Sequence, residues 1–321
     1  MKVIIDKNIP FISGMIEPYA EVEYLSDELI NAERVKGADA LIIRTTVKCD
    51  EQLLAGSKVR FIATATIGTD HIDVDYCSKH DIHVVSAPGC NAQAVCDYVS
   101  EAIDELERTG REIKTIGVVG VGHVGELVAK MAERRGKRVV LNDPPKGIGV
   151  RLDELLQQSD VVSFHTPLTY SGEFSTYHLC GAEQLALCRP DTVIINAARG
   201  GIVDEEALVE SGLPCVIDCW EGEPQINKKL LESSQTKLAS FHIAGYSIEG
   251  KRNASEQCIR AFYEYFGLSS CKCTKNVVSL QSDSVNAEKG DSASGWLRRV
   301  TEQLKAAPDN YSKLRKQYKL R

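Results

Sequence analysis

The chain has 321 residues, of which 43% are hydrophobic and 26% are charged, and this composition is typical of a folded globular protein rather than a disordered chain. Its 38 Lys and Arg residues are outnumbered by 45 Asp and Glu residues, and the net charge of −7 disfavours binding to nucleic-acid phosphates. Because no apolar run is long enough to cross a bilayer and no secretion signal opens the chain, we expect a cytoplasmic protein without nucleic-acid or membrane partners.

The cysteines indicate reduced thiols rather than a disulfide framework. The chain has 11 of them, an odd number, and it lacks a secretion signal. Cys271 and Cys273 do not have the usual two-residue zinc-knuckle spacing, and no set of Cys and His residues completes a tetrahedral site. The sequence therefore predicts no metal.

In the first part of the chain, short apolar runs alternate with polar stretches of helical character. The apolar runs predict buried strands at 3–5, 40–43, 61–65 and 84–85, and the polar stretches predict helices at 27–36, 50–55 and 74–80. Strands that alternate with helices favour a parallel sheet with helices on both of its faces.

A longer helix at 91–109 leads to a second alternating series. In this helix apolar residues recur every three or four positions, and Gly110 ends it. The second series predicts strands at 116–119, 138–141, 160–164, 192–195, 216–217 and 238–239, and helices at 126–135, 152–157 and 205–210. An amphipathic helix at 248–266, a polar linker at 269–294 and a basic helical tail at 296–321 follow.

A glycine-rich turn joins the first strand of the second series to its helix. Gly120, Gly122 and Gly125 fit the G-x-G-x-x-G pattern, and Asp143 ends the next predicted strand 18 residues beyond Gly125. In this pattern the glycines permit a tight turn, let a pyrophosphate approach the helix N-terminus and allow close packing. The carboxylate of Asp143 would accept the ribose hydroxyls and repel a 2′-phosphate, which favours NAD over NADP. The alternative is a glycine-rich turn that binds no ligand.

Three polar clusters follow predicted strands, at the edge where open α/β sheets bind ligands. They contain Arg199, Glu223 and His242. Oxidation of a 2-hydroxy acid needs a base active near neutral pH, a carboxylate to orient it and a cation for the substrate carboxylate, and these residue types suit those roles. Each could instead be a surface or strand-end residue, and His165 competes with His242 as the base.

Taken together, these motifs resemble the D-isomer-specific 2-hydroxyacid dehydrogenases over about residues 1–267. The shared motifs are the glycine turn, His-Thr-Pro-Leu at 165–168, Asn-Ala-Ala-Arg-Gly-Gly at 196–201, Glu223–Pro224 and His-Ile-Ala-Gly at 242–245. The resemblance implies two doubly wound parallel-sheet domains, a Rossmann NAD domain and a flavodoxin-like substrate domain, with a short C-terminal extension. We expect the substrate domain at 1–96, the NAD domain at 97–247, a return helix at 248–267 and a dimerisation extension at 268–321.

The resemblance also implies roles for individual residues. His242 would be the acid/base, Glu223 its partner and Arg199 the residue that binds the substrate carboxylate, while His165 would belong to the cofactor side. Other residues on the cofactor side would be Gly120, Gly122, His123, Val124, Gly125, Asp143, Thr166, Ala197, Ala198, Arg199, Asp218 and Gly245. Thr45, Thr66 and Tyr246 would contact the substrate.

The activity that this resemblance implies is NAD-dependent oxidation of a small phosphorylated 2-hydroxy acid by a homodimer. Arg44 follows a predicted strand and could bind the substrate phosphate, or it could pair with a nearby acid. Two alternatives are 3-phosphoglycerate dehydrogenase and a dinucleotide-sensing, corepressor-like binding protein. The basic residues of the tail suggest docking on an acidic surface or a partner subunit; they are Arg298, Arg299, Lys313, Arg315 and Lys316.

Overall fold

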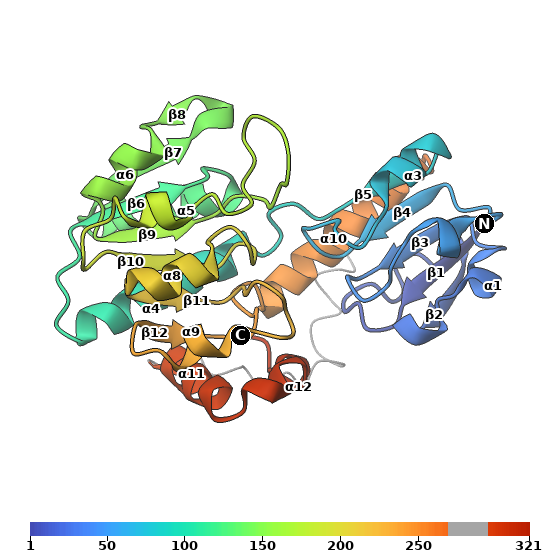
Figure 1. Ribbon diagram of the computed structural model, residues 1–321. Helices are drawn as coiled ribbons and strands as arrows, with labels where there is room; N and C mark the ends of the chain where they lie inside the picture. Colours follow the sequence, from blue (N-terminus) through green and yellow to red (C-terminus); the bar gives the residue numbers. More distant parts are fainter. Residues whose placement is uncertain (269–294) are drawn as a thin grey trace. The chain divides into compact units, whose positions relative to one another are not determined.

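The computed structural model describes residues 1–268 and 295–321, and the chain divides into two compact units. The first contains residues 1–91 and 247–268, and the second contains residues 92–246 and 295–321 (Figure 1). The expected polar linker and the pair Cys271 and Cys273 lie outside the described residues. Within the described ranges, no helix is long and apolar enough to span a membrane, and the nine cysteines are free thiols.

The first unit is built on a five-stranded parallel sheet in the order β2-β1-β3-β4-β5. Its strands are β1 (Lys2–Asp6), β2 (Glu21–Leu25), β3 (Ala40–Ile43), β4 (Phe61–Thr64) and β5 (His83–Val85). Every residue of β3 and β4 is buried, which explains their uninterrupted apolar runs. This strand order is the flavodoxin-like order.

The helices of the first unit begin at side-chain caps. They are α1 (Ala32–Val35), α2 (Glu51–Leu54), α3 (Val74–Lys79) and α10 (Ile248–Tyr265), with a 3-10 turn, η1 (Asp27–Leu29), before α1. We expected one continuous helix at 27–36. The stretch is instead divided, because the Asn31 side chain accepts the N–H of Arg34 and starts a new helix. Helix α10 packs on β4, where Phe61 and Phe262 meet edge to face.

The sequence analysis missed one strand of the first unit. Strand β2 lies at the edge of the sheet and pairs with β1 alone. Four of its five residues are exposed or only partly buried, and two of them are glutamates. Such a strand lacks the continuous apolar run that marks the central strands.

The second unit has a seven-stranded sheet in the order β12-β11-β10-β9-β6-β7-β8, in which β8 runs antiparallel to β7 and the other neighbouring strands are parallel. The strands are β6 (Thr115–Val119), β7 (Arg138–Asp143), β8 (Ile148–Gly149), β9 (Val161–Phe164), β10 (Val193–Asn196), β11 (Cys215–Ile217) and β12 (Thr236–Ala239). The helices are α4 (Ala92–Arg108), α5 (His123–Arg134), α6 (Leu152–Gln158), α7 (Ala182–Leu185), α8 (Glu205–Ser211) and α9 (Lys228–Glu232), with a 3-10 turn, η2 (Pro144–Lys146), after β7. The predicted pair of doubly wound parallel-sheet domains is confirmed.

The strand order reverses at β6. This strand pairs with β7 on one side and with β9 on the other, so the chain leaves β6 in one direction and later returns on its other flank. In open α/β sheets, ligands bind beyond the carboxyl ends of the strands at such a switch point. The glycine turn after β6 and the His165–Thr166 pair after β9 both lie there.

The C-terminal segment belongs to the core of the second unit. Helix α11 (Trp296–Ala306) packs on β12 and α4, and it is followed by a 3-10 turn, η4 (Pro308–Asn310), and by α12 (Tyr311–Gln317) (Figure 1). Leu297 and Leu304 are fully buried. The hydroxyl of Thr301 donates to the carbonyl of Ala239 and accepts its N–H. The basic tail is therefore an integral part of this unit.

The role of α11 can be tested by core truncation. Leu304→Ala removes fully buried methyl groups, so it should lower the free energy of unfolding of the second unit by about 2–5 kcal/mol. Gln303→Ala, on the exposed face of the same helix, should change it by less than about 0.5 kcal/mol. Urea unfolding followed by tryptophan fluorescence measures both, because both Trp residues of the chain, Trp220 and Trp296, lie in this unit.

Candidate active site

Two of the three glycines in the turn leave no room for a side chain. Gly120 has φ 86°, and a Cβ there would lie 2.9 Å from the backbone of His165. A Cβ on Gly125 would lie 1.9 Å from the carbonyl oxygen of Gly120. Gly122 precedes the first residue of α5, and a Cβ there would meet nothing within 4 Å. The turn is thus tightly packed behind the helix N-terminus and open in front of it.

Asp143, at the end of β7, holds this turn in place. Its buried carboxylate accepts the N–H of Val121 through Oδ2 at 2.8 Å. The Lys146 ammonium group donates to the carbonyl of Val121 at 2.7 Å. The sequence analysis assigned Asp143 only to the ribose and did not foresee this supporting role.

The residues around the turn fit a dinucleotide. Helix α5 starts at His123, directly after Gly122, and the N–H groups of its first turn lack partners within the helix, which makes this end suited to an anion. The buried hydroxyl of Thr166 has no hydrogen-bond partner within the described residues, as expected of a group that binds a ligand. Gly120, Gly122 and Thr166 would therefore hold a pyrophosphate between them.

The loop that follows β12 is organised by Asp218. This carboxylate is buried and accepts the N–H of Ile243 at 2.8 Å and that of Ala244 at 3.0 Å. The hydroxyl of Ser240 donates to it at 2.6 Å. Asp218 was expected to contact the cofactor; in the structure its visible role is to fix the loop 240–244, which ends just before Gly245.

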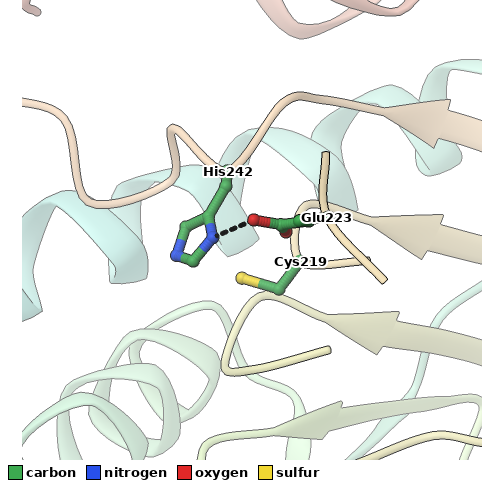
Figure 2. A group of neighbouring side chains, drawn as sticks. All are labelled: Cys219, Glu223 and His242. Atoms are coloured by element: carbon green, nitrogen blue, oxygen red, sulfur yellow. Dashed lines mark hydrogen bonds and ion pairs between the residues drawn. The ribbon is translucent and has the colours of Figure 1, made fainter. Parts of the chain in front are cut away.

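His242 and Glu223 form a hydrogen-bonded pair (Figure 2). His242 Nδ1 lies 2.9 Å from Glu223 Oε2, and Glu223 Oε1 accepts the N–H of Trp220 at 2.8 Å. The backbone of His242 is in the left-handed region, at φ 58°. With Nδ1 donating to the carboxylate, Nε2 is the acceptor nitrogen of a neutral imidazole.

The surroundings of Glu223 favour its carboxylate form. Burial acts to raise the pKa of Glu223, but the hydrogen bond and charge of His242, the N–H of Trp220 and the Arg315 guanidinium outweigh it and hold the pKa below its usual value. The pKa of a nearby carboxyl, that of Glu205 on α8, is shifted in the opposite direction. Burial, reinforced by the neighbouring acids, raises it to about 8, although Glu205 Oε1 accepts the N–H of Glu221.

Cys219 is a neighbour of this pair that the sequence analysis did not single out. Its Sγ and one atom each of Glu223 and His242 lie within 4.8 Å of one another (Figure 2). Burial and the adjacent acids raise the pKa of this thiol well above its usual value, so it stays protonated. Because Nδ1 already donates to Glu223, we interpret the group as an acid/base pair with a packed thiol.

Arg199 is placed on the neighbouring loop after β10. Its Nη1 donates to the carbonyl of Ala198 at 2.9 Å, and the amide of Asn196 donates to the carbonyl of Arg199 at 2.9 Å. The thiol of Cys219 donates to the carbonyl of Ala198 at 3.5 Å, which joins this loop to the loop of Glu223. The loops that carry Arg199, Glu223 and His242 thus follow the adjacent strands β10, β11 and β12.

His165 is unsuited to act as a base near neutral pH. Its Nε2 lies 2.9 Å from the hydroxyl of Ser163, and burial lowers its pKa to about 3. The imidazole therefore stays neutral and binds protons weakly under ordinary conditions. This favours His242 over His165 as the base.

The proposed substrate residues of the first unit follow β3 and β4. Arg44 Nε donates to Asp6 Oδ2 at 2.7 Å, and Asp6 is fully buried. This is the ion pair that the alternative interpretation of Arg44 predicts. Thr45 is exposed, whereas the hydroxyl of Thr66 donates to the carbonyl of Gly68 at 3.2 Å and lies 2.7 Å from that of Thr64.

Comparison with known proteins places this geometry in a family. The family model described as "D-isomer specific 2-hydroxyacid dehydrogenase, NAD binding domain" matches residues 97–244. Erythronate-4-phosphate dehydrogenase of Bacteroides fragilis is 40% identical over 100% of this chain and 97% of its own. The enzyme of the same name from Pseudomonas putida is 41% identical over 83% of this chain and 73% of its own.

Two solved structures have the same fold over most of the chain. The NAD-bound 3-phosphoglycerate dehydrogenase of Entamoeba histolytica matches with a TM-score of 0.70 and 27% identity, covering 85% of this chain and 97% of that one. The TT0316 protein of Thermus thermophilus matches with a TM-score of 0.71 and 26% identity, covering 84% and 98%. The chain therefore belongs to the NAD-dependent D-isomer-specific 2-hydroxyacid dehydrogenase family, in the group of the erythronate-4-phosphate dehydrogenases.

Proposed function

We propose that this protein oxidises 4-phospho-D-erythronate to (R)-3-hydroxy-2-oxo-4-phosphooxybutanoate with NAD, a step in the biosynthesis of pyridoxal 5′-phosphate. The observation that carries the proposal is the His242–Glu223 hydrogen bond, on the same sheet edge as a glycine turn that fits a dinucleotide. Relatives named for this substrate are about 40% identical over most or all of the chain. The first unit would bind the substrate, and the second would bind NAD.

His242 would be the base. Oxidation at C2 requires the hydroxyl proton to leave as the hydride leaves, and Nε2 of a neutral imidazole can accept it. Glu223 bonds to Nδ1, so it fixes the tautomer and stabilises the imidazolium that forms. When bound, NAD supplies the hydride acceptor. The reverse reaction would use the imidazolium as the acid.

Arg199 would bind the C1 carboxylate of the substrate. A guanidinium donates two parallel N–H groups to a carboxylate, and its charge stabilises negative charge that develops on the C2 oxygen. The Asn196 amide holds the backbone carbonyl of this arginine, and the carbonyl of Ala198 accepts a hydrogen bond from its guanidinium. Tyr246, at the end of the loop that carries His242, and Thr45 and Thr66 would supply hydroxyl contacts to the same substrate.

Arg44 remains our candidate for the phosphate. Its Nε is used by Asp6, so any phosphate contact would come from the Nη groups. The Asp6 carboxylate would then hold the guanidinium in position, and the exposed hydroxyl of Thr45 would add a donor. We also propose a cytoplasmic homodimer. Sedimentation of the intact chain tests this assembly. A chain truncated before α11 is unsuitable, because α11 is part of the core and its loss would destabilise the second unit.

Cofactor choice tests the role of Asp143. The enzyme should prefer NAD to NADP by at least about 30-fold in kcat/KM, or ~2 kcal/mol, because a 2′-phosphate would face this carboxylate. Asp143→Asn keeps an oxygen to accept the N–H of Val121 but removes the charge. It should therefore reduce the preference for NAD, mainly by raising kcat/KM with NADP. Equal kcat/KM for the two cofactors in the parent enzyme would contradict this role.

The acid/base assignment is tested with 4-phosphoerythronate and NAD by following the absorbance of NADH. His242→Ala should lower kcat by about 10²-fold or more with NADH affinity unchanged, since general acid–base catalysis contributes 10²- to 10⁴-fold. Glu223→Gln should mainly move the pH optimum. A larger loss of kcat in His165→Ala, with NADH affinity retained, would show that the base is misassigned.

The substrate assignment is tested with the same assay. Faster turnover of 3-phosphoglycerate than of 4-phosphoerythronate would refute the proposed substrate.

The phosphate assignment is tested by a substrate pair. Arg44→Ala should raise KM for the phosphorylated acid by about 10-fold or more and change KM little for an unphosphorylated 2-hydroxy acid. Thermal unfolding is the control, because the variant leaves the buried Asp6 carboxylate without its partner. Equal losses with both substrates, together with a lower Tm, would show that Arg44 is structural.

A further inference from the structure

The C-terminal helix α12 brings a cation to the catalytic pair. Arg315 Nη1 lies 3.9 Å from Glu223 Oε2, which is also the oxygen bonded to His242. Arg315 Nε donates to the hydroxyl of Tyr246 at 3.1 Å, and the guanidinium lies 5.6 Å from the centroid of that ring. One side chain from the end of the chain therefore contacts both the partner of the proposed base and a proposed substrate residue.

The segment around Arg315 is anchored on both sides. Tyr311, one turn earlier, is 2% exposed. Tyr318 packs edge to face on Phe241, at 5.8 Å between ring centroids. Arg321 donates to the carbonyl of Ala244 at 2.6 Å and lies 4.2 Å from the centroid of Trp296. Arg315 itself is about two-thirds buried, with 33% of its side chain exposed. Its position is thus fixed by the packing of residues 311–321 on the loop 241–246.

We propose that Arg315 is a positioning residue of the catalytic pair, whose charge holds Glu223 as a carboxylate facing His242 and sets the pH at which His242 acts as a base. Its Nε also orients the Tyr246 hydroxyl. This inference rests on the proposed acid/base role of the pair. It assigns to the C-terminal helix a function in the reaction of its own chain, which is distinct from a role in assembly.

The sign of the effect follows from the charges. Glu223 stabilises the imidazolium of His242, whereas the guanidinium of Arg315 repels it and stabilises the carboxylate. The lowered pKa of Glu223 agrees: burial acts to raise it, and the charge of Arg315 is one of the influences that lower it, after His242 and the Trp220 N–H. Removing the cation should therefore make protonation of His242 easier, so a higher pH would be needed to form the neutral base.

Other charged and titratable groups lie around the pair and stay in place in the variants. Burial raises the pKa of Glu205, on α8, to about 8, so this carboxyl becomes negatively charged only at alkaline pH. The others are Arg199 on the loop after β10, Asp218, Cys219 and Glu221 on the loop after β11, Tyr246 on the loop after β12, and Tyr311 on α12.

Three variants of α12 separate charge from structure. Arg315→Gln removes the charge, Arg315→Lys keeps it, and Lys316→Gln removes an equal charge from an exposed position on the same helix. Two measurements are made on each: the pH profile of kcat/KM, and the NMR titration of the His242 imidazole without substrate, assigned by its absence in His242→Gln. The dissociation constant of NADH and the Tm report on folding.

For Arg315→Gln we expect the acidic limb of the profile and the NMR midpoint to move up together by about one pH unit, with NADH affinity within twofold of the parent. Arg315→Lys and Lys316→Gln should keep both near the parent values. A uniform loss of activity with an unmoved midpoint would overturn the proposal, as would a downward shift. If Arg315→Gln does not fold, an upward shift in Arg315→Lys would equally refute the role of the charge. Since the titration needs no substrate, it tests this inference even if 4-phosphoerythronate is not oxidised.

Discussion

The buried carboxylate of Asp218 is the group on which the arrangement of the proposed acid/base pair depends. Three of its donors, Ser240, Ile243 and Ala244, come from the segment after β12, so this loop must turn back on itself around one anion. A buried carboxylate without such partners would be strongly destabilising, and the loop therefore has little freedom. The turn holds His242 at a positive φ and presents its ring to Glu223.

The reversal of strand order at β6 explains why distant residues gather at one edge. The glycine turn, the Arg199 loop, the Glu223 loop and the His242 loop each follow a strand of the same sheet. Because these strands are parallel, their carboxyl ends meet at that edge. Asp143 adds a second constraint, since its bond to the N–H of Val121 ties the end of β7 to the glycine turn. The sheet thus sets the place of each loop, and the buried carboxylates of Asp143 and Asp218 fix the glycine turn and the His242 loop.

The C-terminal segment joins the stability of the second unit to its chemistry. Helix α11 contributes Leu297, Val300 and Leu304 to the core, and η4 and α12 follow it. The packing that buries α11 therefore also places Arg315 beside Glu223. Loss of this segment would remove part of the core and the cation together, so a truncation by itself does not separate the two contributions.

The sequence alone predicted the two parallel-sheet domains, which the structure confirms, and indicated the dinucleotide turn. The proposed acid/base pair of His242 and Glu223 came from the resemblance to the family, because spacing alone left His165 as a competitor. The domains and the turn follow from local signals: buried strands are short apolar runs, and the G-x-G-x-x-G pattern of glycines marks the turn. Edge strand β2 was not predicted, because most of its side chains are exposed or only partly buried and it lacks an apolar run. The tertiary structure alone decided that Asp218 fixes a loop, that Cys219 packs beside the pair and that Arg315 reaches Glu223 across 92 positions of the chain. No local pattern marks such contacts, because a charge 3.9 Å away in space can be anywhere in the sequence, and only the folded packing brings it near.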